Sequence, residues 1–167
     1  SSENVGAAWD IIEEAPVFTD EQRLRCGNTL AVFLSMMTTH VYEWGRLHAS
    51  ESITWNHITY PLVGVYWLAR HFDRFYDGLD GRTDAMLAEV HGCFRGQMKS
   101  WKPREDAMGY CTSSPRHTIE YSLAEGDYSF FESGHARTWA EYLVHCSNNR
   151  GDGSGFGDAG YGQTIYE

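Results

Sequence analysis

Residues 61–76, PLVGVYWLARHFDRFY, decide the fold, because apolar side chains recur through them at helical spacing. A helix that is apolar over more than half of its circumference is covered by its neighbours, so this segment is predicted to be a mostly buried helix. Pro61 suits the first turn of such a helix, and Asp77-Gly78 places a glycine beyond its end. The apolar residues of the segment are Leu62, Val63, Val65, Tyr66, Leu68, Ala69, Phe72, Phe75 and Tyr76.

One further helix is predicted on each side of this segment. Thr19 and Gln22 form a capping-box pattern ahead of apolar residues at helical spacing, which predicts a long helix from about 20 to 44. Thr83 is predicted to cap another helix, which continues as far as Trp101 and is stopped by Pro103.

The C-terminal half is less regular. Residues 104–118 are polar and contain glycine and serine, which predicts a long loop. A short helix from about 118 to 125 and a longer one from about 129 to 147 are predicted after it. Because no stretch alternates as a strand does, the predicted fold class is all-α, with consecutive helices joined as antiparallel hairpins. Residues 1–167 are predicted to be a single helical domain and an incomplete piece of a protein that continues beyond Glu167.

The composition excludes several classes of protein. With 42% hydrophobic and 14% aromatic residues, the chain is not of the disordered class. Lys and Arg number 13 against 23 Asp and Glu, and the net charge of −10 disfavours nucleic acid as a partner, because a duplex needs basic residues against its phosphates. No apolar run is long enough to span a membrane, and the first ten residues carry no signal-peptide pattern.

No metal site and no cofactor are predicted. The cysteines, Cys26, Cys93, Cys111 and Cys146, are spaced by 67, 18 and 35 residues, unlike the paired cysteines of a zinc site or a dense disulfide framework. The eight histidines form no H-E-x-x-H motif.

Asn56 and His57 stand just before the buried helix, where free backbone N–H groups and the helix dipole favour an anion. An amide donor and an imidazole at this place can bind a substrate carboxylate. The alternative is a polar helix entrance in which Asn56 or Thr59 is only the cap. Tyr110 lies one hairpin later, and since a hairpin returns the chain to the end where it began, Tyr110 is expected to face the Asn-His pair. Packing of Tyr110 on the base of its own loop is the alternative.

Arg116 and His117 follow at the start of the next predicted helix. Arg116 is one of few cations near the expected site, and its guanidinium can hold a carboxylate in a bidentate fork. A solvated surface pair is the alternative.

Residues 54–72, TWNHITYPLVGVYWLARHF, resemble the Asn-His segment and following helix of the heparinase II/III-like and related alginate lyases. Residues 105–110, EDAMGY, are similar to the place where those lyases carry their catalytic tyrosine. The resemblance implies a catalytic domain that is an incomplete (α/α) toroid, followed in many members by a β-sandwich. It also implies β-elimination on a uronic-acid polysaccharide by a secreted or periplasmic enzyme.

The resemblance also implies roles for individual residues. Asn56, assisted by His57, would neutralise the C5 carboxylate. Tyr110 would protonate the leaving oxygen and, in substrates of suitable stereochemistry, also act as the base. His117 or His57 is the alternative base. Residues that would bind the acidic polysaccharide are Trp55, Tyr60, Arg116 and Tyr161, and Tyr161, at the end of GSGFGDAGY, also competes with Tyr110 for the catalytic role.

Two other functions remain open from the sequence. Glu105 and Asp106 are a candidate acid and base for a glycoside hydrolase on a similar helical barrel, although adjacent carboxylates seldom face one sugar from opposite sides. A non-catalytic helical domain that binds carbohydrate is the other alternative. Its sugar platforms, or its core, would be Trp55, Trp67, Trp101 and Trp139.

Overall fold

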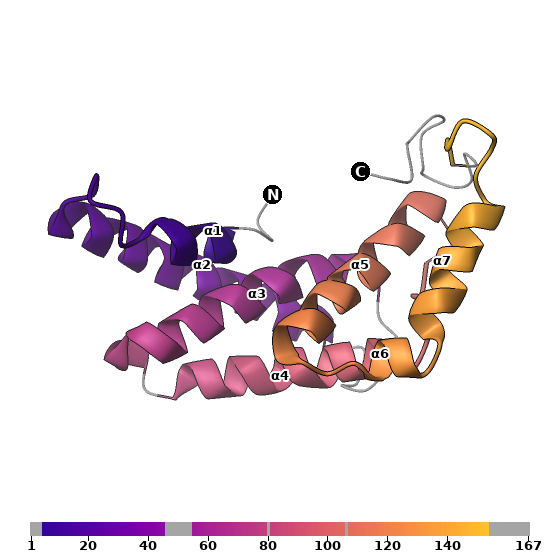
Figure 1. Cartoon of the computed structure of the whole chain (residues 1–167). Helices are drawn as coiled ribbons and strands as arrows, with labels where there is room; N and C mark the ends of the chain where they lie inside the picture. Colours follow the sequence, from indigo (N-terminus) through magenta and orange to yellow (C-terminus); the bar gives the residue numbers. More distant parts are fainter. Residues whose placement is uncertain (1–4, 46–54, 80, 106, 154–167) are drawn as a thin grey trace. The chain divides into compact units, whose positions relative to one another are not determined.

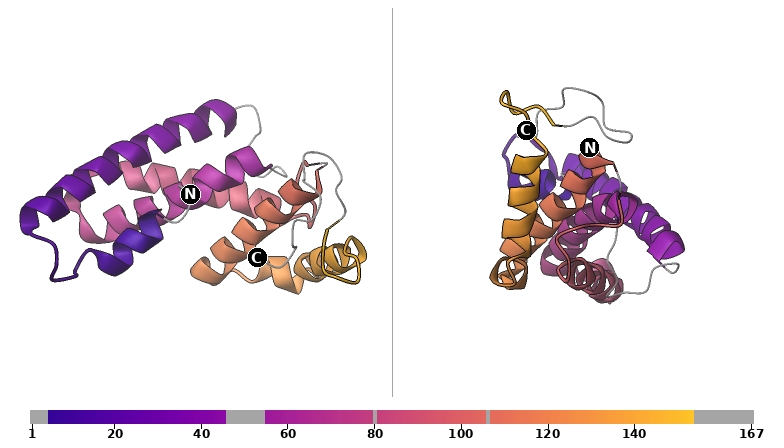
Figure 2. Two further views of the ribbon diagram at one scale, coloured as in Figure 1. Left: turned by 90° about the horizontal axis from the view of Figure 1, so that it is seen from above. Right: turned by 90° about the vertical axis from the view of Figure 1, so that its right-hand side faces the viewer.

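The computed structural model describes residues 5–45, 55–79, 81–105 and 107–153 (Figure 1, Figure 2). These residues form seven α-helices and no strand, with one isolated bridge between Ser147 and Gly153, so the predicted all-α class is confirmed. The chain divides into two compact units, Ser1–His48 with Tyr60–His91 and Ala49–Thr59 with Gly92–Glu167. The single domain over 1–167 stays a prediction. No helix within the described ranges has both the length and the apolar character to cross a membrane.

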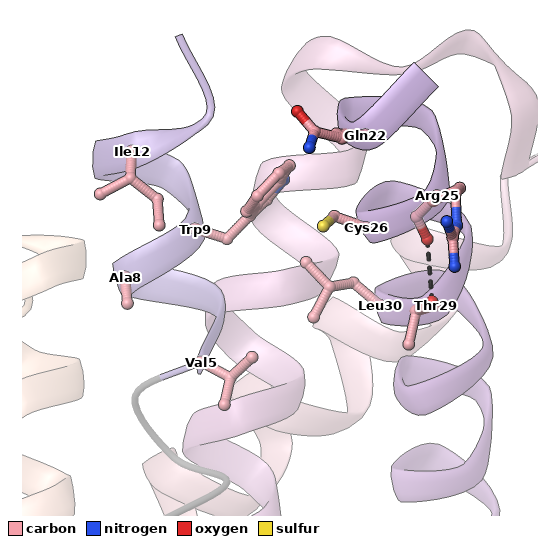
Figure 3. Close-up of a pocket in the computed structure, with 9 residues that line it drawn as sticks. All are labelled: Val5, Ala8, Trp9, Ile12, Gln22, Arg25, Cys26, Thr29 and Leu30. Atoms are coloured by element: carbon pink, nitrogen blue, oxygen red, sulfur yellow. Dashed lines mark hydrogen bonds between the residues drawn. The ribbon is translucent and has the colours of Figure 1, made fainter. Parts of the chain in front are cut away.

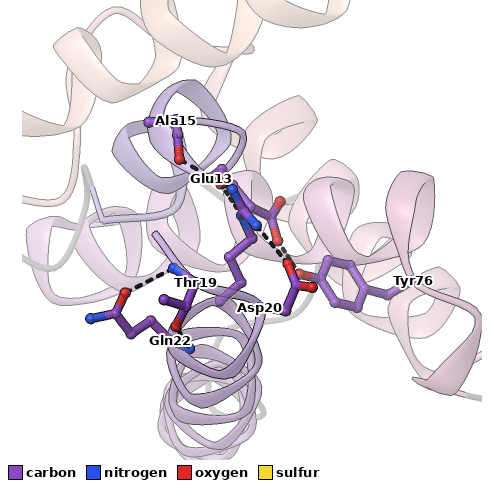
Figure 4. A network of polar contacts seen from close by, with 7 residues as sticks. Glu13, Ala15, Thr19, Asp20, Gln22 and Tyr76 are labelled. Atoms are coloured by element: carbon purple, nitrogen blue, oxygen red, sulfur yellow. Dashed lines mark hydrogen bonds and ion pairs between the residues drawn. The ribbon is translucent and has the colours of Figure 1, made fainter. Parts of the chain in front are cut away.

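The first unit contains α1 (Val5–Ile12), α2 (Asp20–Gly45), most of α3 (Asn56–Phe75), the 3-10 turn η2 (Asp77–Leu79) and the start of α4 (Arg82–Gln97). The long helix expected from about 20 to 44 is confirmed as α2. Its capping box is also confirmed, because the Thr19 N–H donates to Gln22 Oε1 at 2.8 Å and the Gln22 N–H donates to Thr19 Oγ1 at 3.2 Å (Figure 4).

Helix α3 supplies the core of the first unit, as its apolar pattern predicts. Its buried apolar side chains are Leu62, Val63, Val65, Tyr66, Leu68, Ala69 and Phe72. Phe75 differs, because it is 57% exposed at the last position of the helix. The predicted start at Pro61 is wrong. The helix begins five residues earlier, at Asn56, because side-chain oxygens satisfy its first backbone N–H groups.

Helix α1 is a helix that the sequence did not predict, and polar contacts attach it to α3. The His71 ring is buried, with Nδ1 at 2.8 Å from Asp10 Oδ1 and Nε2 at 3.1 Å from Glu13 Oε2. The Tyr76 hydroxyl donates to the Glu13 carboxylate (Figure 4), and burial, followed by this bond, raises the pKa of Tyr76 to about 12. The Arg23 Nε–H donates to the Glu13 carbonyl at 2.9 Å. Charged and polar groups of three helices therefore meet at the end of α1.

Gly6 sets how closely α1 approaches α3. A Cβ atom at Gly6 would lie 2.9 Å from both the Leu68 backbone nitrogen and Leu68 Cγ, so only a hydrogen side chain fits there. Gly27 in α2 is a matched contrast, because the nearest atom to a Cβ there would be the Tyr76 hydroxyl oxygen at 3.4 Å, followed by two carbons of the same ring at 3.8 Å.

Gly6→Ala is therefore expected to lower the free energy of unfolding by about 1–3 kcal/mol, as overpacking against backbone does. Gly27→Ala is expected to be neutral or stabilising by about 0.5–1 kcal/mol, since alanine is the better helix former. Urea unfolding followed by circular dichroism, with hydrogen exchange of the α1 amides, measures both variants. If Gly6→Ala and Gly27→Ala changed the free energy of unfolding equally, the close approach of α1 to α3 at Gly6 would be contradicted.

The second unit contains the first turn of α3, the end of α4, α5 (Met108–Glu125), α6 (Ser129–Glu132) and α7 (His135–His145). Helices α5, α6 and α7 contact one another. The core includes Phe94 stacked on Tyr121, with ring centroids 4.6 Å apart at 13°. Burial, followed by the nearby Glu125 carboxylate, raises the pKa of Tyr121 to about 12. The fully buried Phe130 adds to this core.

Three predictions for this half are wrong. The expected loop at 104–118 is mostly helix, since α5 begins at Met108 and absorbs the short helix expected near 118–125. Hydroxyls of its threonines bond their own helix, as when Thr118 Oγ1 donates to the Ser114 carbonyl at 2.8 Å. The helix expected at 129–147 is broken into α6 and α7, because Gly134 adopts a left-handed φ of 82°. Helix α4 ends at Gln97, so Trp101 lies outside it.

Candidate functional site

The first turn of α3 holds the Asn56 side chain in one orientation. The His57 backbone N–H donates to Asn56 Oδ1 at 2.8 Å, and the Asn56 backbone N–H donates to Glu105 Oε1 at 2.8 Å. Because a backbone N–H needs an acceptor, the side-chain atom facing His57 is the amide oxygen and not the nitrogen. The Nδ2 group keeps its two donors, and it makes no hydrogen bond within the described part of the chain, where Asn56 is 6% exposed.

Thr59, one turn later in α3, joins this turn to α5. Its Oγ1 lies 3.2 Å from Ser114 Oγ and 3.1 Å from His117 Nδ1. Residues 110, 114 and 117 recur at helical spacing on one face of α5, so Tyr110 lies one turn before Ser114 on the face that meets Thr59. Glu105, which accepts from Asn56, comes just before α5 begins. Asn56 and Tyr110 are thus at the same end of the contact between α3 and α5, and Tyr110 is 38% exposed there.

His117 is fully buried behind this contact. Its Nε2 lies 3.3 Å from an Arg116 Nη2 and its Nδ1 lies 3.1 Å from Thr59 Oγ1. A guanidinium can only donate, so Nε2 accepts from it and the ring proton is on Nδ1, which donates to Thr59. This tautomer is a neutral imidazole. The geometry makes His117 a positioning residue between α5 and α3, because neither ring nitrogen faces solvent.

The other predicted site residues are placed differently. His57 is exposed at the start of α3, and its ring lies 5.5 Å from that of half-buried Trp55. Arg116 is exposed on α5. Tyr60 is half-buried and belongs to the first unit. Tyr161 lies outside the described residues.

The structure adds residues that sequence reasoning did not place in the site. Thr59 and Ser114 carry the contact between the two helices, and Glu105 holds the start of α3. No local pattern identifies Glu105 as the partner of Asn56, because 49 residues separate them. The hydrolase alternative gains nothing from this geometry, since Glu105 already accepts from Asn56 and Asp106 lies outside the described residues.

Metal ligation has no support in the described ranges, where no three His, Cys, Asp or Glu side chains are close enough to hold an ion. An open pocket of about 510 Å³ does occur in the first unit, between α1 and α2 (Figure 3). Its lining is mostly apolar, whereas a sugar site needs several converging polar groups. The lining residues are Val5, Ala8, Trp9, Ile12, Gln22, Arg25, Cys26, Thr29 and Leu30.

Comparisons of this chain with family models, with curated proteins and with solved structures give no match.

Proposed function

We propose that this protein is a polysaccharide lyase, which cleaves a uronic-acid-containing polysaccharide by β-elimination. The observation that carries the proposal is the orientation of Asn56. Its amide oxygen is bonded to the helix end and its amide hydrogens are left for a ligand, at the same end of the helix contact as the exposed Tyr110.

The reaction requires groups of these types. Elimination removes the proton from C5, breaks the bond between C4 and the glycosidic oxygen, and forms a double bond between C4 and C5. The C5 proton becomes acidic when donors offset the charge of the neighbouring carboxylate, because negative charge grows on that carboxylate in the transition state. Asn56 Nδ2 supplies two such donors, and the exposed His57 imidazole beside it supplies another.

Tyr110 is proposed to give its hydroxyl proton to the leaving glycosidic oxygen. A tyrosine can serve both steps if its phenolate first takes the C5 proton and then gives that proton to the leaving oxygen. His57 is the alternative base, since its ring is exposed whereas that of His117 is buried. In this proposal Arg116 and Trp55 contact neighbouring sugars, and His117 with Thr59 keeps the two helix ends in register.

The resemblance of residues 54–72 and 105–110 to the heparinase II/III-like lyases supports the same activity. It extends the proposal to an (α/α) toroid and to a secreted or periplasmic enzyme with an acidic polysaccharide as its substrate. The net charge of −10 makes local donors necessary, because the overall field repels a polyanion.

Product analysis tests the activity. The natural full-length protein is incubated with alginate, heparan sulfate and other uronate polymers, and unsaturated ends are detected by their ultraviolet absorbance and by mass. Products with a C4–C5 double bond are expected. New reducing ends without a C4–C5 double bond would contradict the proposal and indicate a glycoside hydrolase. Retention of the protein on an immobilised glycan without any product would also contradict the proposal and indicate a carbohydrate-binding domain.

A further inference from the structure

The pocket between α1 and α2 takes no part in the proposed elimination, and all of its lining belongs to the first unit (Figure 3). Its volume of about 510 Å³ lies within the range of roughly 300–1,000 Å³ that is typical of small-molecule sites. Gln22, Cys26 and Leu30 recur at intervals of four residues, so they line the pocket from one face of α2. Trp9 lines it from α1.

Apolar side chains of both helices form most of the pocket surface. Trp9 is only 6% exposed, and Phe18 packs against its ring with centroids 5.8 Å apart at 54°, so the indole is a fixed wall. Val5 and Ile12 of the lining are 38% and 44% exposed. Because these aliphatic side chains lose contact with water when an apolar molecule fills the hollow, hydrophobic burial favours a ligand with an apolar body.

The polar groups of the lining offer mainly hydrogen-bond donors. The Thr19 N–H donates to Gln22 Oε1 at 2.8 Å, so the capping box engages the amide oxygen and leaves the two hydrogens of Gln22 Nε2. Figure 3 shows this nitrogen on the side of the amide that faces Trp9. The Thr29 hydroxyl donates to the Arg25 carbonyl at 2.8 Å, so its hydrogen is bound within α2. Since the Arg25 guanidinium has only donors, a ligand group that meets this lining has to accept hydrogen bonds.

The charge of the lining is opposite to that of the chain. Arg25 is the only charged residue among the described residues that line the pocket, although the chain has 23 acidic and 13 basic residues. Arg25 follows Gln22 by three residues, so the two side chains are neighbours on the surface of α2 and their donors can converge on one group. A carboxylate matches them, because a guanidinium binds its two oxygens in a bidentate fork.

We propose that this pocket binds a small amphipathic carboxylate, of the chemical class of the medium-chain fatty acids. The apolar chain lies against Trp9 and Leu30, and the carboxylate accepts from Arg25 and Gln22. A neutral alcohol of the same chain length keeps the hydrophobic burial but loses the charge-assisted hydrogen bonds, so it binds more weakly. The site is in the first unit and does not depend on lyase activity, and its test uses no polysaccharide.

Alkylation of Cys26 locates the ligand. This thiol belongs to the pocket lining and is half-buried, as is the thiol of Cys146 in the second unit (Figure 3). The natural full-length protein is titrated with sodium octanoate, pulse-labelled with N-ethylmaleimide and digested for mass spectrometry. At a concentration about ten times its dissociation constant, octanoate is expected to slow the labelling of Cys26 about tenfold, because only the unliganded fraction reacts. Labelling of Cys146 is expected to stay unchanged. Unaltered labelling of Cys26, or an equal effect on both thiols, would overturn the proposal.

Titration calorimetry tests the head group. Arg25→Gln is expected to weaken octanoate binding by about 3- to 10-fold and to leave binding of 1-octanol unchanged, because it removes one charged donor at an exposed position. Arg82→Gln, at an exposed cation of the same unit outside the lining, is the matched control and is expected to bind octanoate as the wild type does. Equal affinity of the wild type for octanoate and 1-octanol would overturn the proposed carboxylate site, and this comparison needs no variant to fold.

Ala8→Trp tests the pocket itself. Ala8 is exposed at the lining, so an indole there fills the hollow without entering the core, and octanoate binding is expected to be lost. Undiminished binding in this variant would overturn the pocket as the site. Light scattering of the ligand-free protein distinguishes the other occupant. A dimer that Ala8→Trp dissociates would overturn the proposal, because a second copy of the chain would then cover the pocket.

Discussion

Asn56→Asp is expected to lower kcat/KM on uronate polymers by about 10²–10³-fold, while the protein stays folded. Aspartate keeps an oxygen at the position that accepts the His57 N–H at 2.8 Å, and it is as good a helix cap as asparagine. It removes both Nδ2 donors and adds a negative charge where the substrate carboxylate would bind. The substitution therefore separates the role of Asn56 in catalysis from its role in the helix.

Two further variants complete this experiment. Asn56→Ala removes both the oxygen and the donors, so it is expected to lose activity and also about 1 kcal/mol of stability. Asn149→Asp, at an exposed position of the same unit, makes the same chemical change and is expected to keep wild-type kinetics. Initial rates of ultraviolet absorbance give kcat/KM, and thermal unfolding reports the fold. Wild-type kinetics in Asn56→Asp would remove Asn56 from the site and leave it as a cap.

The helix predictions that were correct depend on local patterns, and those that were wrong depend on contacts between residues far apart in the sequence. Helix α3 and the capping box of α2 were predicted because their patterns, an apolar run and a reciprocal Thr19–Gln22 pair, lie within a few residues of each other. Helix α5 was missed because Gly109, Ser114 and Pro115 are poor helix formers, and burial against neighbouring elements outweighs that preference.

Helix α1 escaped prediction for a similar reason. Only eight residues long, it is too short to be stable by itself, and it is attached through contacts with residues far along the chain, such as Gly6 on Leu68 and Asp10 on His71. No window of the sequence contains both halves of these contacts.

The same distinction between local patterns and distant contacts applies to the residues of the candidate site. Asn56 was proposed as a site residue because a polar residue before a buried helix is a local pattern, and that role stays a prediction. The burial of His117 was not foreseen, because an Arg-His pair next to serines and a proline resembles a solvated surface. Thr59 pairs with His117 across 58 residues, and this contact makes the imidazole part of the interior.

Tyr110→Phe is expected to lower kcat by about 10²–10⁴-fold with little change in KM, because it removes only the hydroxyl proposed to transfer protons. The ring stays in the first turn of α5, where it is 38% exposed, so the stability of the unit is expected to be unchanged. Tyr128→Phe, at an exposed tyrosine of the same unit, is the matched control and is expected to keep full activity.

Tyr161→Phe decides between the two candidate tyrosines. Loss of kcat in Tyr110→Phe alone would support Tyr110 as the acid, since the phenylalanine variants differ only in the position of the missing oxygen. Loss in Tyr161→Phe alone would transfer the role to Tyr161 and leave β-elimination as the reaction. If both variants keep full activity, a tyrosine acid is wrong, and His57 becomes the group that must both remove the C5 proton and protonate the leaving oxygen.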